Sequence, residues 1–456
     1  MDFYFQTSDQ NSIPLELHTK TGFDEMVTSS TDFTSNWLLS SKRSDSIGAY
    51  YLIPNERGEV SKVIAIVADE LSIWSIACLP LKLPQGDYHL SNVNSISEKE
   101  MLTLGWGMGA YQYTKYHQGE ASARLKVDAD LNLTKVDSIL NATFLVRDLI
   151  NVPANDMLPS HLTDEAKRLA QTHKADFVEI RGDDLLKQNY PLIHAVGRAS
   201  TDEPRLLKLT WGNESDPLLG IVGKGVCFDS GGLDLKPASG MRWMKKDMGG
   251  AAHALGLASY IMANALPVRL QVLIPAVENA VAGNAFRPGD IIKSRSGKTI
   301  EIDNTDAEGR LVMADALTEL SAINPDLLID FSTLTGAARV ALGTEVGVFF
   351  SKSDKTSHAL YKSANEVEDD IWRLPLHKGY KGQLKSSIAD LVNCSSSGYG
   401  GAITATLFLN EFVGQECDWL HFDVMAYNMR NRPGRPKGGE AMGLRSVCHF
   451  LESRYT

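Results

Sequence analysis

The heptapeptide NTDAEGR at residues 304–310 places two carboxylates and a guanidinium within five positions. Each charged residue has an ordinary structural explanation. Asp306 could cap the helix expected from Leu311, and Glu308 could interact favourably with the positive end of that helix. Arg310 could be a surface ion-pair partner that contributes little stability. The heptapeptide alone does not decide between these roles and a catalytic one.

A second segment, residues 222–250 (VGKGVCFDSGGLDLKPASGMRWMKKDMGG), also combines acidic and basic residues. Its charges are too irregularly spaced for a solvated helix face, and its glycines allow tight turns and close approach of a ligand. The residues that could do chemistry here are Lys224, Asp229, Lys236 and Asp247. We interpret two further acids, Asp234 and Asp303, as ordinary turn residues.

Four carboxylates in these two segments would make a metal site if the fold brought them together: Asp229, Asp247, Asp306 and Glu308. Without cations, mutual repulsion and burial would protonate some of them. Two divalent ions about 3.5 to 4 Å apart would remove that repulsion, activate a bridging water and polarise a carbonyl. The sequence has no H-E-x-x-H or C-x-x-C motif, so the ligands are expected to be mostly oxygen.

The two lysines of the second segment fit such a site in different ways. Lys236, beside Pro237, would be a fixed ammonium that stabilises a developing oxyanion. Lys224 could act as a second oxyanion donor, or as a metal ligand if it were neutral, which coordination would have to favour. Chemistry alone leaves the role of Lys224 open. Hard oxygen ligands suit Mg or Mn, whereas an amine ligand also suits Zn.

The motif NTDAEGRL, taken together with VGKGVCFDSGG, LKP and MKKDMGGAA, resembles the leucine (cytosol) aminopeptidase family, peptidase family M17. The stretches NVPANDMLP, AVGRAS, RPGDII and STLTGA support the resemblance. It extends from about residue 100 to the C-terminus.

The resemblance implies a role for each charged residue. Asp229 and Glu308 would bridge the two metal ions. Asp306 would complete one metal site, and Lys224 with Asp247 would complete the other. This assignment makes Lys224 a metal ligand, the role that chemistry alone left open.

Two catalytic residues and a substrate pocket also follow from the resemblance. Lys236 and Arg310 would act without binding metal, and Arg310 would hold a bicarbonate anion that shuttles the proton. Met244, Thr333 and Gly336 would line the pocket for the first side chain of the substrate. Met244 could instead be a simple gap filler, and Thr333 could merely end a strand.

The function implied is a two-metal aminopeptidase that releases N-terminal Leu and other apolar residues from peptides through a metal-bridged water, in a homohexamer. Alternatives are a dipeptidase, such as a cysteinylglycine hydrolase, and an aminopeptidase-fold regulator that binds nucleic acid. The net charge of -11 and the absence of a continuous basic stripe disfavour nucleic acid. The N-terminus lacks the pattern of a signal peptide, and no run of about 20 apolar residues is present. We therefore expect a cytoplasmic protein with no membrane partner.

These residues must be positioned by a fold, and the chain of 456 residues is too long for one ordinary core. We predict a smaller N-terminal α/β domain over residues 1–133 and a larger catalytic domain over residues 134–456. A helical apolar period predicts a connecting helix at about 134–151, ended by Pro153.

In the larger domain, β-like runs alternate with helical patterns, as in the runs at 206–211, 218–222, 270–274, 327–331 and 419–422. This alternation predicts a mostly parallel central sheet flanked by helices, with ligands bound at the carboxyl ends of its strands. In the N-terminal domain we expect strands at 63–68 and 73–78. Its Gly105, Gly107 and Gly109 favour a tightly packed helix start over a nucleotide-binding loop.

Overall fold

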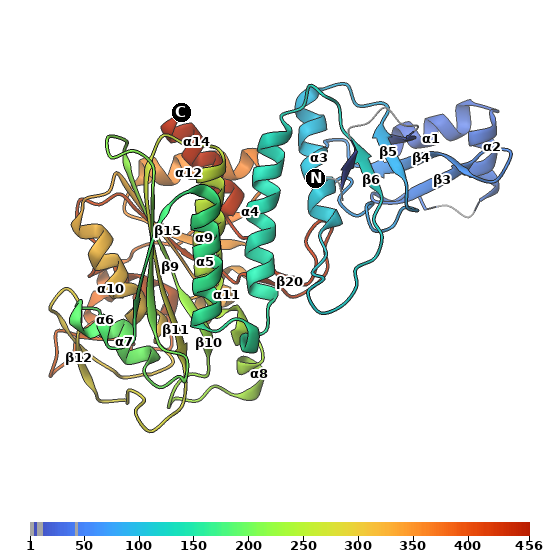
Figure 1. Ribbon diagram of the computed structural model, residues 1–456. Coiled ribbons are helices and arrows are strands. Elements are labelled where there is room, and N and C mark those ends of the chain that lie inside the picture. The colour runs from blue at the N-terminus through green and yellow to red at the C-terminus, as the bar shows by residue number, and fades with distance from the viewer. Residues whose placement is uncertain (1–3, 7–11, 42–43) are drawn as a thin grey trace. The chain divides into compact units, whose positions relative to one another are not determined.

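The computed structural model describes residues 4–6, 12–41 and 44–456 of the chain. It divides into two compact units, one of Met1–Leu140 with Arg430–Lys437 and one of Asn141–Met429 with Gly438–Thr456. The predicted connecting segment is a single helix, α4 (Leu133–Asn151), which ends two residues before Pro153 (Figure 1). A proline cannot continue a helix because it has no backbone N–H to donate.

The N-terminal unit is built on a mixed sheet in the order β1-β6-β5-β2-β4-β3. Its strands are β1 (Phe5–Gln6), β2 (Ile13–Thr19), β3 (Tyr50–Pro54), β4 (Val60–Val67), β5 (Asp87–Leu90) and β6 (Arg124–Lys126). Its helices are α1 (Lys20–Ser29), α2 (Phe33–Ser40) and α3 (Ile96–Ala110). Phe23, Val27 and Leu38 from the helices pack on Ile53 and Ile64 of the sheet, which makes one apolar core.

Two expectations for this unit need correction. The predicted strand at 73–78 is wrong: the segment forms successive turns, with Ser75 N donating to Ser72 O and Ala77 N donating to Trp74 O. Ile73 and Ile76 are buried, but their spacing of three belongs to turns and not to a strand.

The three glycines are tightly packed as expected, but they lie in the last turns of α3 and not at a helix start. A Cβ atom at Gly105 would lie 1.7 Å from the carbonyl oxygen of Ile73, and one at Gly109 would lie 2.0 Å from that of Ala77. The glycines therefore allow the helix to contact the turn backbone directly.

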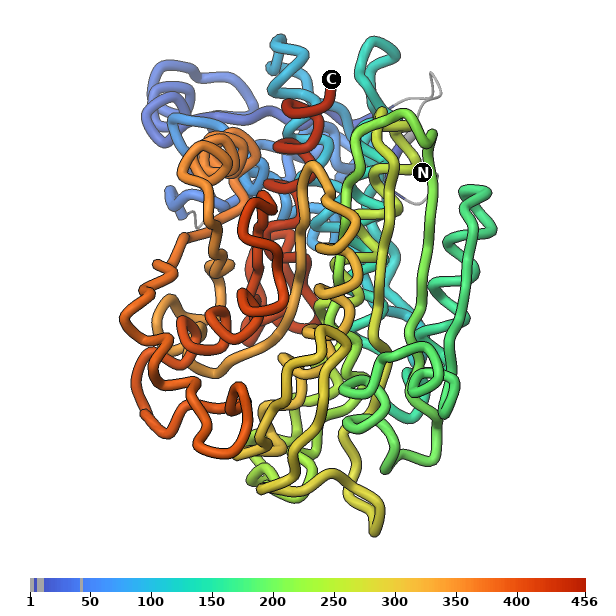
Figure 2. The backbone as a smooth tube through the Cα atoms, turned by 90° about the vertical axis from the view of Figure 1, so that its left-hand side faces the viewer, coloured from blue at the N-terminus to red at the C-terminus, as the bar shows by residue number. Residues whose placement is uncertain are grey.

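The second unit contains the predicted central sheet, in the order β16-β15-β18-β14-β9-β11-β8-β7, with β10 added beside β11. Its strands are β7 (Asp176–Arg181), β8 (Arg205–Trp211), β9 (Leu218–Gly223), β10 (Gly225–Asp229), β11 (Arg269–Asn279), β14 (Leu327–Ser332), β15 (Gly347–Ser351), β16 (Ile371–Arg373) and β18 (Trp419–Asp423). The central pairs β9–β11, β9–β14 and β14–β18 are parallel, and antiparallel pairs lie toward both edges. β8 and β11 run side by side in both views (Figures 1 and 2).

Helices cover both faces of this sheet, as two-sided burial of its central strands requires. α5 and α9 lie on one side and α10 lies on the other (Figure 1). The helices of the unit are α5 (Pro159–His173), α6 (Asp184–Lys187), α7 (Pro191–Gly197), α8 (Ala238–Met241), α9 (Gly249–Ala263), α10 (Gly309–Ala322), α11 (Gly336–Leu342), α12 (Asp354–Glu366), α13 (Gly401–Asn410) and α14 (Leu444–Tyr455). Short 3₁₀ turns are η1 (Ala154–Asp156), η2 (Met244–Met248) and η3 (Lys378–Leu384).

Two small sheets complete the unit. One contains β12 (Ile291–Lys293), β13 (Thr299–Glu301) and β17 (Leu391–Val392), and the other contains β19 (Tyr427–Asn428) and β20 (Gly438–Gly439). Within the described ranges, no helix is both long enough and apolar enough to cross a membrane.

Candidate active site

The site lies where parallel strands of the central sheet end. Lys224 directly follows β9, Asp229 is the last residue of β10, and Thr333 directly follows β14. Because β9 pairs in parallel with β14 and β11 pairs in parallel with both β9 and β10, these strand ends meet at one edge of the sheet. The sheet therefore gathers side chains that are far apart in the sequence.

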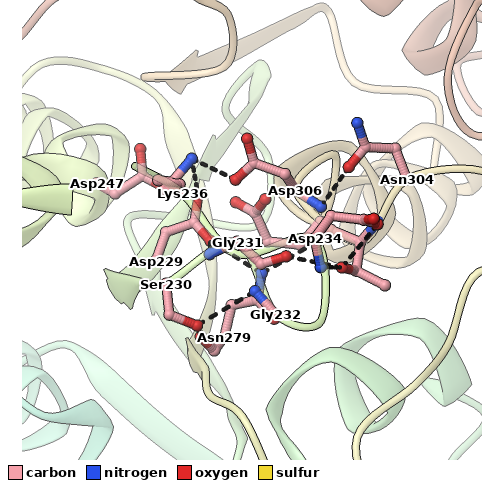
Figure 3. A network of polar contacts seen from close by, with 12 residues as sticks. Asp229, Ser230, Gly231, Gly232, Asp234, Lys236, Asp247, Asn279, Asn304 and Asp306 are labelled. Carbon is pink, nitrogen blue, oxygen red and sulfur yellow. Dashed lines mark hydrogen bonds and ion pairs between the residues drawn. The ribbon is translucent and has the colours of Figure 1, made fainter. Parts of the chain in front are cut away.

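The loop at 304–310 leads into α10, but its charges do not cap that helix. Glu308 occupies the N-cap position without a side-chain cap bond. The side chain of Asp306 is bound by Lys236 (Figure 3). The helix-capping interpretation of these two acids is therefore not supported.

A separate set of hydrogen bonds fixes the loop. Thr305 N donates to Asp234 Oδ2 at 2.7 Å, and Thr305 Oγ1 donates to the carbonyl oxygen of Gly231 at 2.7 Å. Asn304 Oδ1 accepts a bond from Asp306 N at 2.7 Å. Asp234, which the sequence suggested was an ordinary turn residue, thus ties the loop to the segment that carries Asp229 and Lys236.

Lys224 lies between two carboxylates in the interior. Its Nζ is 2.7 Å from Asp247 Oδ2 and 2.9 Å from Glu308 Oε1, and all three side chains are at most 3% exposed. Its amine also limits the start of α10, because a Cβ atom at Gly309 would lie 2.5 Å from Lys224 Nζ. Glycine at 309 is therefore required for the observed position of the amine.

Lys236 makes the second pair of contacts, with Asp229 and Asp306. Its Nζ is 2.8 Å from Asp229 Oδ2 and is also bonded to Asp306, and it points between the two acids in Figure 3. Gly231, with φ of +89°, allows the turn between these residues, and its N–H donates to Asp229 Oδ1 at 2.9 Å.

Two ammonium groups therefore contact four carboxylates closely, and a third, Lys246 Nζ, lies 4.0 Å from Asp247 Oδ1. The carboxylates still outnumber the ammonium groups in this largely buried place. Burial and the charge of Asp229 raise the pKa of Glu308 to about 8, and they raise the pKa of Asp306 to about 6. Ligand oxygens of Asp229, Asp306 and Glu308 lie within 4.8 Å of one another. A site that disfavours its own ionised carboxylates is one that divalent cations fit.

Asp247 is held differently from the other acids. Burial would raise its pKa, but the ammonium of Lys224 lowers it to about 2. Thr333 Oγ1 donates to Asp247 Oδ1 at 2.7 Å, so this threonine supports a carboxylate as well as bordering the pocket. Behind Asp247 lies Lys246, whose pKa is lowered to about 7 by burial and by the nearby charge of Arg339.

Arg310 is buried, with 7% of its surface exposed, so the interpretation as a surface ion-pair partner is wrong. One guanidinium N–H donates to the carbonyl oxygen of Asn393 at 2.8 Å, and its Nε has no hydrogen-bond partner among the described residues. Burial lowers its pKa. A buried, partly used guanidinium fits an anion as its missing partner.

A pocket of about 260 Å³ opens over these groups. Met244, Thr333 and Gly336, expected to contact the first side chain of the substrate, all line it, as do Lys236 and Arg310. Open space surrounds the position of a Cβ atom at Gly336. The structure thus brings the three pocket residues to the same cavity as the charged groups.

Three neutral or basic residues of the site were not recognised in the sequence. Asn279 Nδ2 donates to Asp229 Oδ1 at 2.8 Å and to the Thr305 carbonyl oxygen at 3.1 Å. Asn393 Oδ1 accepts from Asp303 N, and Arg339 lines the pocket. The place of Asn279 at the end of a strand was a usable signal, whereas nothing in the sequence distinguishes Asn393.

Comparison with known proteins finds a matching family model for each of the two domains of the chain. The model of the cytosol aminopeptidase family, catalytic domain, matches residues 144–448, and that of the M17 aminopeptidase N-terminal domain matches residues 13–127. Peptidase B of Pectobacterium carotovorum subsp. carotovorum (strain PC1) is 40% identical over 372 residues, which are 78% of this chain and 85% of that protein. A probable cytosol aminopeptidase of Chlamydia abortus is 41% identical over 331 residues, 71% of this chain and 66% of the relative.

Solved structures also superpose on almost the whole chain. The cytosol aminopeptidase from Coxiella burnetii superposes with a TM-score of 0.96 at 44% identity, covering 99% of both chains. The bottromycin maturation enzyme BotP in complex with Mn has a TM-score of 0.85 at 29% identity, covering 98% of this chain and all of that one.

Proposed function

Since the chain belongs to the cytosol aminopeptidase family M17 and is a metallo-aminopeptidase, we propose that it removes N-terminal residues, Leu and other apolar ones, from peptides. The observation that carries this proposal is the buried cluster of four carboxylates and two lysines beneath a pocket. We also propose that residues 134–456 form the catalytic domain and residues 1–133 a separate one, a division supported by the two family-model matches.

Two divalent ions would be held by Lys224, Asp229, Asp247, Asp306 and Glu308. When bound, such ions polarise the scissile carbonyl and make water nucleophilic near neutral pH. The closeness of the oxygens of Asp229, Asp306 and Glu308 supports their proposed role as ligands. We propose Zn or Mn, with Mg as a further candidate; the Mn complex of BotP supports Mn.

Lys236 would donate to the substrate from its present position once cations balance the charges of Asp229 and Asp306. Its Nζ lies at the pocket wall between Asp229 and Asp306. As a fixed ammonium it would donate to the oxyanion that forms when water adds to the carbonyl.

Arg310 would hold a bicarbonate anion, which would supply a group able to accept and donate a proton beside the scissile bond. The unpaired Nε of this buried guanidinium supports an anion there. The anion would replace the side-chain base that such a reaction normally needs.

The decisive experiment compares a leucyl amide with its N-acetyl derivative, using protein of measured metal content. An exopeptidase of this kind needs the free amine, so the acetylated compound should not be hydrolysed. Equal turnover of both would overturn the proposal. Comparing free dipeptides, including cysteinylglycine, with longer peptides separates the aminopeptidase from a dipeptidase. We further propose a homohexamer in the cytoplasm, which sedimentation and cell fractionation would test.

A further inference from the structure

A second pocket of the same unit, of about 930 Å³, lies apart from the catalytic one and shares no lining residue with it. Its volume is near the upper end of the range of about 300–1,000 Å³ typical of small-molecule sites. We call it the basic pocket. Its charged lining residues are Lys298, Lys352, Arg373, Lys378, Lys381 and Glu411.

Its single acidic lining residue does not balance its cations. Glu411 sits between two lysines, with Oε2 2.8 Å from Lys298 Nζ and Oε1 2.6 Å from Lys381 Nζ. Partial burial would raise the pKa of Glu411, but these two ammonium groups lower it. Glu411 therefore already forms ion pairs with two lysines and does not pair with the other cations of the pocket.

Two of the remaining cations, Lys352 and Arg373, are held by backbone oxygens and an exposed carboxylate. Lys352 Nζ donates to the carbonyl oxygen of Gly414 at 2.8 Å, and burial lowers its pKa. Arg373 donates to Ser351 O at 2.8 Å and to Asp354, whose side chain is 81% exposed. These contacts position the positive groups around the pocket without neutralising Lys352.

The uncharged part of the wall combines three polar residues, Ser351, Asn410 and Gln415, with five apolar ones: Leu374, Pro375, Leu376, Leu407 and Val413. A cavity with cations on one part of its lining and aliphatic side chains on another fits a ligand with an anionic end and an apolar or planar body. A guanidinium and several ammonium groups together suit the compact charge of phosphate groups better than dispersed carboxylates.

We propose that the basic pocket binds a small organic phosphate of nucleotide size, with its phosphates beside Lys352, Arg373 and Lys378 and its organic part against Leu374 and Leu407. This site is independent of the peptidase reaction. The basic pocket carries an excess of positive charge although the whole chain has a net charge of -11. A general attraction of anions to the protein therefore does not explain phosphate binding at this pocket.

The test is calorimetric titration of ADP into the metal-loaded enzyme at low ionic strength. Wild-type protein should bind ADP saturably, and a Lys352→Ala/Lys378→Ala double variant should bind it at least about tenfold more weakly, because two charge-assisted contacts are lost. Lys378→Ala alone changes an exposed side chain and serves as the variant least able to disturb folding. The matched control is Lys362→Ala on α12, which removes an exposed lysine outside the pocket and should leave binding unchanged.

Several outcomes would overturn the proposal. One is the absence of saturable ADP binding at millimolar concentration. Another is equal binding by wild type and double variant, as ADP held at the catalytic metals would give. Adenosine, or an N-acetylated triglutamate peptide, binding as tightly as ADP would also overturn it. Hydrolysis of a leucyl amide by the double variant should match wild type, so this result is separable from the proposed peptidase function.

Discussion

The catalytic cluster and the basic pocket are opposite cases of charge imbalance in one unit. In the cluster, four carboxylates face two lysines, and the side chain of Glu308 is 1% exposed. In the basic pocket the excess is positive, and the side chain of Lys381 is 60% exposed. Water screens the second imbalance more than the first, because Lys224, Asp229, Asp247 and Glu308 are at most 3% exposed.

Burial, more than the number of like charges, therefore decides whether bound ions are needed to balance a charged site. The buried cluster raises the pKa of Glu308 to about 8, so it resists full ionisation unless cations enter. The exposed pocket can remain empty at little cost. We therefore expect removal of the metals to change the properties of the whole catalytic unit. An empty basic pocket should leave the rest of the unit unchanged.

The largest expected effect comes from removing charge from the buried cluster. Glu308→Gln keeps the shape of the side chain but deletes an anionic ligand, and kcat/KM should fall on the order of 10³-fold, since metal catalysis contributes several kcal/mol. Metal content measured on the same sample should fall as well. Glu319→Gln on α10, which alters the ion pair with Lys208 of β8, is the control and should retain activity. A Glu308→Gln enzyme with full metal and full activity would exclude Glu308 as a ligand.

A second test concerns the buried cation beside the cluster. Arg310→Met should lower kcat on the order of 10²-fold, the scale of a lost proton-transfer group. In bicarbonate-free buffer, added bicarbonate should stimulate wild type but not the variant. Stimulation of both to the same degree would place the anion elsewhere.

A third test uses two glycines that both begin helices, α10 and α11. Gly309→Ala forces a Cβ atom against Lys224 and should destabilise the protein by about 1–3 kcal/mol while weakening metal binding. Gly336→Ala enters open space and should change only the preference for the first side chain of the substrate. Denaturant unfolding and rates on a series of amino-acid amides would measure both effects. Equal loss of stability in the two variants would contradict the packing argument.

A smaller effect is expected from an amide that only supports a ligand. Asn279→Ala removes the donor to Asp229, and metal affinity should fall about tenfold, at the low end of effects seen for groups behind the ligands. Asn284→Ala, which removes a bond to the carbonyl oxygen of Arg198 at an exposed position, is the control. Metal titration with a chromophoric chelator distinguishes the two; unchanged affinity in Asn279→Ala would show that Asp229 needs no such support.

A further test examines the burial argument away from the metal site. Burial raises the pKa of Asp315 to about 7, although backbone N–H groups of Arg295, Leu192 and Ile193 donate to it and oppose the shift. The native state then binds this proton more tightly than the unfolded state. The stabilisation is complete below about pH 4 and is lost as pH rises toward 7.

Urea unfolding at pH 4.5 and pH 8 should therefore show a smaller decline in stability for Asp315→Asn than for wild type. The substitution removes the titration and keeps one carbonyl oxygen, which can accept from Leu192 and Ile193 or from Arg295 but not from both sides. An identical pH dependence in both proteins would mean that burial does not penalise this carboxylate.

The alternation of apolar runs was enough to predict the two-part α/β fold and the edge of the sheet at which polar residues collect. Lys224 and Asp229 follow or end recognisable strands, so their convergence could be expected from the rule for parallel sheets. Their individual roles remain predictions. The resemblance to a family, and not the spacing of residues, gave Lys224 its proposed role as a ligand.

Other features could not be read from the sequence for physical reasons. Asn393 binds Arg310 through its backbone carbonyl oxygen and the loop at 304–310 through its side-chain amide. Both contacts join residues more than 80 positions apart, so only the folded chain reveals them. Asp234 resembles any turn aspartate until Thr305 is beside it. The turns at 73–78 have the composition of a strand, and only their packing against the α3 glycines distinguishes them.

The segment Arg430–Lys437 clusters with Met1–Leu140 although it lies near the other end of the chain. There the Arg435 guanidinium stacks 3.8 Å from the centre of the Trp74 ring, and Gly434 leaves room for that ring. The first unit is thus discontinuous in sequence, and no single cut yields both units whole. A gene fragment starting after α4 would encode the basic segment Arg430–Lys437 without the Trp74 ring that packs on it. To produce the second unit alone, that segment must be replaced as well as the first 140 residues removed.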